Sequence, residues 1–180
     1  YSCNEWVYPD SEADNGCYAI DIVQPRNSYA CAQLLVEVET PISICWESDD
    51  GMPSPEIFRL LPVFVEKNTG VPGFTVEPGT PASYATRQAP FWVFDALEPM
   101  TGPLVRPDNA TVLGVYLRWS TRELVAKTVT GRLIISTLNE QAVIPVTLTV
   151  ANARVPEQET FRLSNWFSIE NMATYHHTFF

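Results

Sequence analysis

The sequence predicts an all-β protein, namely an antiparallel β-sandwich of immunoglobulin-like type with about seven to nine short strands. Apolar residues recur at every second position along most of the chain, which is the period of a strand with one buried face. Fifteen prolines against eight glycines indicate short strands joined by Pro-bearing loops, because proline disrupts helix interiors and central strands. Patterns of helical period are nearly absent before residue 164.

The first predicted strands lie between residues 29 and 46. One face of the stretch 30–38 is wholly apolar and consists of Ala30, Ala32, Leu34, Val36 and Val38. The opposite face carries Gln33, Glu37 and, just beyond, Glu39, which predicts a half-buried strand with a polar outer face. In the next strand Ile42, Ile44 and Trp46 alternate in the same way, so we expect Trp46 in the core.

The middle of the chain is less regular. Residues 56–67 predict a strand, and Pro62 within it indicates a sheet edge or a bulge. Residues 68–90 contain four prolines and three glycines without any period, so we expect a long loop or two short strands with wide turns. Residues 90–97 are apolar on both faces, which predicts a strand buried on both sides, with Trp92 inside.

The last strands give the clearest pattern. Leu117 and Trp119 share one face of a strand over residues 111–120, which places Trp119 in the core. Residues 130–152 alternate in two arms around a turn at 138–141, and this predicts a β-hairpin with one face in the core.

A short helix is predicted near the end of the chain, over residues 168–176. Ser168 is a suitable N-cap, and Glu170 lies in the first turn, where its charge favours the helix dipole. So short a helix is marginal on its own, and its apolar face needs a partner. We therefore expect a sandwich domain over residues 1–160 and a linker with the start of a helix over 161–180, leading into a further domain.

Composition excludes several classes of function. With 21 acidic and 11 basic residues the net charge is −10, which disfavours binding to the phosphates of nucleic acid. The sequence has no basic amphipathic stretch, and its longest apolar runs are too short to span a bilayer, so we expect no membrane partner. The sequence lacks a Gly-rich loop of the kind that binds nucleotide phosphates, so we expect no cofactor.

The four cysteines all lie in the first quarter of the chain, at positions 3, 17, 31 and 45. If residues 2–8 and 16–23 form a hairpin folded about Asp10, Cys3 and Cys17 fall opposite each other, and they are then the best disulfide candidate. Cys31 and Cys45 lie in apolar strand-like stretches, and we expect them to be buried free thiols. No Cys or His spacing indicates a metal site.

Part of the chain resembles a known family. The segments "RQAPFWVFDAL", "GVYLRWS" and "GRLIISTLNEQAVIPVTLTV", followed by a Pro-bearing linker and the Trp-containing "SNWFS", cover residues 87–177. They are similar to the N-terminal β-sandwich region of bacterial glycoside hydrolase family 123-like proteins, in which a sandwich precedes a (β/α)8 barrel.

The resemblance implies hydrolysis of N-acetylgalactosaminides by the parent protein, assisted by the acetamido group of the substrate and carried by an adjacent Asp-Glu pair in the barrel. This chain has no Asp-Glu dipeptide, so it carries over no catalytic residue and is expected to be a non-catalytic accessory domain. Its partner is then the catalytic domain of the same polypeptide. The contact residues we expect are Phe161, Trp166, Phe167, Met172 and His176, and a fragment that exposes them is expected to self-associate.

The alternative function is a free-standing carbohydrate-binding module. Such sandwiches stack sugar rings on exposed aromatic faces, and Trp6 with Tyr8 is the most plausible exposed pair because the N-terminal stretch lies near a sheet edge. A complete enzyme is the least favoured class. The acidic pairs Asp49–Asp50 and Glu37–Glu39 are expected to be solvated. The adjacent His176 and His177 point apart in a helix or a strand and do not converge on a metal.

Overall fold

The structure is a computed structural model that describes residues 1–12, 19–68 and 86–157. Its described part is all-β and holds eight strands. They are β1 (Ile20–Arg26), β2 (Tyr29–Val36), β3 (Ser43–Ser48), β4 (Glu56–Val65), β5 (Phe91–Pro99), β6 (Leu113–Ser120), β7 (Lys127–Ser136) and β8 (Gln141–Arg154). The predicted helix at 168–176 and the domain boundary at 160 lie outside the described residues.

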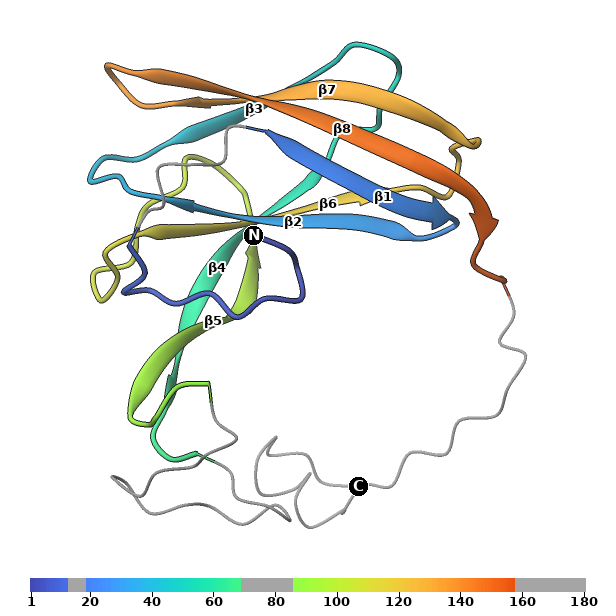
Figure 1. Ribbon diagram of the computed structural model, residues 1–180. Coiled ribbons are helices and arrows are strands. Elements are labelled where there is room, and N and C mark those ends of the chain that lie inside the picture. Colours follow the sequence, from blue (N-terminus) through green and yellow to red (C-terminus); the bar gives the residue numbers. More distant parts are fainter. Residues whose placement is uncertain (13–18, 69–85, 158–180) are drawn as a thin grey trace, which may run out of the picture.

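The strands form two sheets that pack face to face (Figure 1). One sheet has the order β1-β8-β7-β3 and the other the order β2-β6-β4-β5. All neighbours are antiparallel except β1 and β8, which pair in parallel from Ile20↔Val146 onward. The predicted all-β sandwich is therefore confirmed, and its immunoglobulin-like character in the narrower sense stays a prediction.

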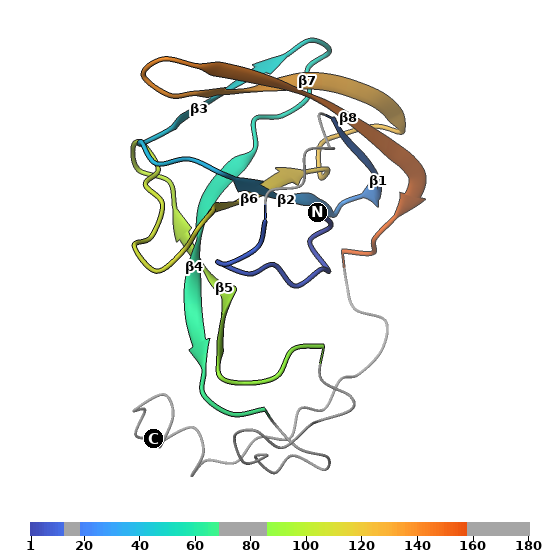
Figure 2. The ribbon, with the colours of Figure 1, turned by 60° about the vertical axis from the view of Figure 1, so that its left-hand side comes forward.

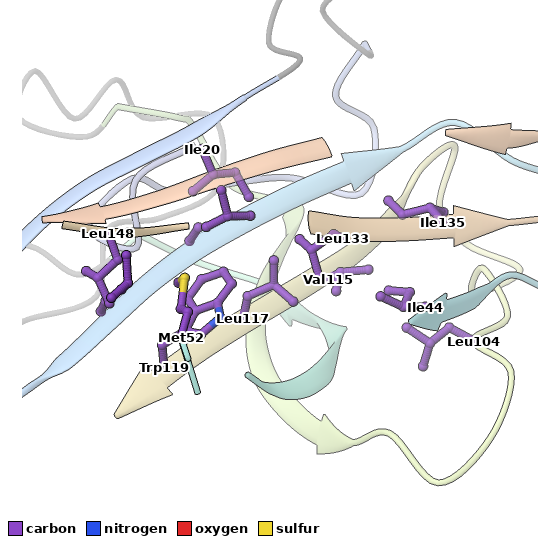
Figure 3. Close-up of a cluster of buried hydrophobic side chains, with 14 of the residues drawn as sticks. Ile20, Ile44, Met52, Leu104, Val115, Leu117, Trp119, Leu133, Ile135 and Leu148 are labelled. Atoms are coloured by element: carbon purple, nitrogen blue, oxygen red, sulfur yellow. The ribbon is translucent and has the colours of Figure 1, made fainter. Parts of the chain in front are cut away.

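The core lies between the two sheets, where the predicted alternation places one face of each strand (Figure 3). Trp119 is fully buried there among Leu117, Leu133 and Leu148. Trp46 on β3 packs against this core, with its ring centroid 5.8 Å from that of Trp119. The core positions predicted for both tryptophans are confirmed, as is the β7–β8 hairpin, whose arms pair from Lys127↔Val150 to Ser136↔Gln141.

The pair β4–β5 leaves the sandwich. β4 pairs with β6 only from Glu56 to Arg59, whereas its pairing with β5 continues to Val65 (Figure 2). The register shifts between Leu61 and Pro62, so the bulge predicted from the proline is confirmed. Beyond that bulge the two strands form a ribbon, and for this reason Trp92 is not buried as predicted but 41% exposed.

A second, smaller cluster lies on the outer face of the sheet β2-β6-β4-β5. Its buried members are Val7, Leu60, Phe94, Ala110 and Val112. Val7 belongs to the N-terminal segment, residues 1–12, which crosses this face (Figure 1). The sheet is thus covered on both sides over this area, and the N-terminal segment defines the surface described next.

Candidate functional site: a hollow beside the N-terminal segment

The N-terminal segment is fixed at its first residues by Gln33 of β2. The side chain of Gln33 is only 5% exposed, and its Nε2 donates to the backbone oxygens of Ser2 at 2.7 Å and Glu5 at 3.0 Å. The backbone N–H of Gln33 donates to the oxygen of Tyr1, and the N-terminal ammonium of Tyr1 donates to the oxygen of Gln33, both at 3.0 Å. Both amide protons of Gln33 are therefore used to hold this segment.

The alternation of β2 correctly assigns Gln33 to the face away from the core. That face is not solvated at this position, because the N-terminal segment covers it. The expectation of a solvated polar face holds further along, where Glu37 and Glu39 are exposed. A glutamine in the apolar stretch of a strand was the only sequence signal of this anchor.

The other end of the segment is fixed to β5 and to the loop that precedes β6. The N–H of Phe94 on β5 donates to the oxygen of Val7 at 3.0 Å, and the N–H of Thr111 donates to the oxygen of Pro9 at 2.7 Å. Val7 is buried in the outer cluster beside Leu60 and Phe94. Backbone pairing and apolar burial together position the intervening residues, including Trp6.

A hollow of about 380 Å³ lies between this segment and the sheet. Its lining combines apolar and polar side chains, including Asn4, Glu5 and Trp6 of the segment and Asp95, Leu97 and Tyr116 of the sheet. Trp6 is 62% exposed. An exposed indole beside carboxylate, amide and phenol groups has the chemistry to hold a ligand with one apolar face and several hydroxyls.

The half-buried Tyr8 ring is contacted by two other side chains. The guanidinium of Arg87 lies 4.5 Å from the centroid of the Tyr8 ring, and Phe91 meets that ring edge-on at 6.0 Å. Arg87 also forms an ion pair with Asp10, and the hydrogen bond from Arg87 holds the pKa of the Asp10 carboxyl below its ordinary value. Of the two predicted aromatics, Trp6 is exposed and Tyr8 is half-buried, and their joint role in stacking a sugar stays a prediction.

A polar row continues from the hollow along the outer face of the sheet. Burial raises the pKa of the Cys31 thiol and of the Tyr116 hydroxyl, and each of these groups also influences the pKa of the other. Next to them the Arg118 Nε donates to Glu56 at 2.6 Å, and this hydrogen bond lowers the pKa of the Glu56 carboxyl. Neither pair brings together an activated nucleophile and a base.

The remaining candidate residues do not meet at this hollow. Asp49 and Asp50 are exposed at the other sheet, as expected, near Arg132 and Thr130 respectively. The predicted domain-contact residues, from Phe161 to His176, lie outside the described residues, as does His177. In the described ranges no group of three His, Cys, Asp or Glu side chains could hold a metal ion, and no helix there is long and apolar enough to cross a membrane.

The cysteines only partly follow the prediction. Cys31 is half-buried, but Cys45 is exposed, because on β3 the buried Ile44 faces the core and Cys45 faces outward. The hairpin that suggested a Cys3–Cys17 disulfide is not supported by its described residues, since Ile20–Val23 pair with β8. Cys17 lies outside the described residues, so that pairing itself stays a prediction.

Fold and site together define a β-sandwich domain with a hollow on the outer face of one sheet. No protein-family model matches the sequence, and no curated protein matches it. Among the solved structures that match, one is a family 123 glycoside hydrolase from Clostridium perfringens, studied for glycolipid glycan hydrolysis. The match has a TM-score of 0.54 at 10% identity and covers 77% of this chain.

This chain spans only about a quarter of the hydrolase structure, since the match covers 24% of it. At this identity the likeness concerns the fold: a sandwich of this kind occurs within a larger glycoside hydrolase chain. The resemblance drawn from residues 87–177 is thereby supported as a distant structural one.

Proposed function

We propose that this chain is a non-catalytic accessory domain of a larger glycoside hydrolase, which packs against the catalytic (β/α)8 barrel of the same polypeptide. The observation that carries the proposal is the structural match, in which 77% of this chain corresponds to only 24% of a hydrolase. The two carboxylates that line the hollow, Glu5 and Asp95, both belong to exposed residues, and the proposal gives them no catalytic role. The work of the domain is then to cover an apolar barrel surface and hold the barrel in position.

The contact with the barrel is assigned to aromatic side chains, which carry much of the energy of protein interfaces. Phe161, Trp166, Phe167, Met172 and His176 remain the proposed contacts from the sequence. Among the described residues, Phe64 and Trp92 add an exposed aromatic pair on the β4–β5 ribbon, with ring centroids 5.0 Å apart. Such a pair on a projecting ribbon suits contact with a neighbouring domain.

The encoding gene provides the test of the accessory role. We expect the open frame to continue past the codon for Phe180 for about 250 residues or more, with the strand–helix alternation of a barrel and an adjacent Asp-Glu pair at a strand end. A stop codon directly after Phe180 would contradict the proposal. Release of nitrophenol from 4-nitrophenyl N-acetyl-β-galactosaminide by the 180-residue chain alone would contradict it as well.

The hollow favours a second function, carbohydrate binding by the domain itself. If sugars stack on Trp6, the Trp6→Ala variant should bind a soluble oligosaccharide containing N-acetylgalactosamine about tenfold or more weakly than the parent chain. Titration calorimetry measures this affinity. Trp92→Ala is the matched control, because it removes another exposed indole outside the hollow. Equal affinities of all three proteins, or no binding by the parent, would refute sugar binding at Trp6.

A further inference from the structure

The backbone places two cysteines side by side where the N-terminal segment meets β2. Ser2 forms an antiparallel bridge with Ala32, and the two hydrogen bonds between Tyr1 and Gln33 fix the same register one residue away. In that register Cys3 lies opposite Cys31. Directly opposed residues of antiparallel strands have Cα atoms about 4.5–5.5 Å apart, which falls within the range of about 4.4–6.8 Å that disulfides require.

The side chains agree with the backbone. Both residues line one hollow of the surface between the segment and β1–β2, and the Cys3 thiol influences the pKa of the Cys31 thiol. Cys3 is exposed and Cys31 is half-buried. Cys45 offers a contrast, because it is exposed on the other sheet and its partner in the register is Ile134.

We infer that Cys3 and Cys31 form a disulfide bond under oxidising conditions and that this bond locks the N-terminal segment across the sheet. The oxidant is a small-molecule disulfide. The exposed Cys3, as its thiolate, attacks one sulfur of the oxidant and releases one thiol. Cys31 then gives its proton to solvent and attacks the Cys3 sulfur, which releases the second thiol. Two electrons pass from the cysteine pair to the oxidant, which ends as two thiols.

The order of the two attacks follows from the surroundings of each thiol. Burial raises the pKa of the Cys31 thiol, and a negative charge on Cys3 raises it further. Cys31 is therefore the weaker first nucleophile, while Cys3 is open to an incoming reagent. Once formed, the bond joins the segment that carries Trp6 to β2, next to the anchor Gln33, so oxidation would restrain one wall of the hollow.

Peptide mapping tests the pairing directly. The chain is equilibrated with oxidised glutathione, free thiols are blocked with iodoacetamide, and the protein is digested after Glu, Lys and Arg without reduction. This digestion separates all four cysteines, since they fall in residues 1–5, 13–26, 27–37 and 40–47. We expect peptide 1–5 linked to peptide 27–37 in a protein that runs as a monomer on a non-reducing gel.

Stability gives the second measurement. We expect oxidation to raise the melting temperature of the parent chain by about 5–10 °C. Cys31→Ala and Cys3→Ser should abolish both the linked peptide and this shift, whereas Cys45→Ala should keep both. Cys3→Ser alters an exposed side chain and keeps the test valid if Cys31→Ala does not fold.

Three outcomes would overturn the inference. The first is a link between peptides 1–5 and 13–26, which would be the competing Cys3–Cys17 bond. The second is complete alkylation of Cys3 and Cys31 after oxidation, which would show that no bond forms. The third is a link between peptides 1–5 and 27–37 that is found only in a covalent dimer, which would show that the bond joins two chains.

Discussion

Replacement of Trp119 by alanine should lower the free energy of unfolding by about 3–5 kcal/mol. The indole is fully buried between the two sheets and packs against the ring of Trp46 at an interplanar angle of 59°. Its loss removes the largest fully buried side chain of the described core and leaves a cavity that its rigid strand neighbours fill only in part. The aromatic contact with Trp46 is lost as well, which accounts for about 0.5–1.5 kcal/mol of the cost.

Urea denaturation followed by far-ultraviolet circular dichroism measures this change without relying on tryptophan fluorescence. Trp92→Ala is the matched control, since it deletes the same side chain from the exposed ribbon. The control should cost about 1 kcal/mol or less, because it loses mainly the contact with Phe64. Similar costs for both variants would show that Trp119 is not at the centre of the core.

The strands could be predicted where the alternation of apolar residues is local. The faces of β2 and β6 follow from stretches such as Ala30–Val38, and the β7–β8 hairpin follows from two such stretches joined by a short turn. The parallel pairing of β1 with β8 could not be predicted in this way, because it joins segments from opposite ends of the sequence. A period of two says which face of a strand is buried but not which strand lies beside it.

The candidate site was predictable only at single residues. A position near a sheet edge favours Trp6 as an exposed aromatic, but the hollow beside it depends on contacts between Glu5 and Gln33 and between Val7 and Phe94. Residues 1–12 have no period that reveals these contacts. The error at Trp92 has a related cause. The strand β5 is apolar on both faces, but its pairing with β4 continues beyond the residues at which β4 pairs with β6, so Trp92 lies outside the sandwich.

A second large loss of stability is expected when Gly131 is replaced by alanine. Gly131 lies on β7 opposite Ser48 and faces the core, where the benzene ring of Trp46 occupies the space of a side chain. A Cβ at this position would lie 2.3 Å from Cζ2 and 2.4 Å from Cη2 of Trp46, and 2.8 Å from the backbone oxygen of Glu47. The methyl group would displace the Trp46 ring from Trp119, at a cost of about 2–3 kcal/mol.

Two further variants identify the cause of that loss. Gly102→Ala is the control, because a Cβ there meets nothing within 4 Å, and its effect should be neutral or slightly stabilising. Trp46→Phe removes the ring atoms that collide with the new methyl group, so the double variant should be more stable than the sum of the two single changes implies. Strictly additive free energies from urea denaturation would show that the collision with Trp46 is not what makes glycine necessary at position 131. A coupling energy of about 1 kcal/mol or more would tie the packing of Trp46 in the core to the absence of a side chain at position 131.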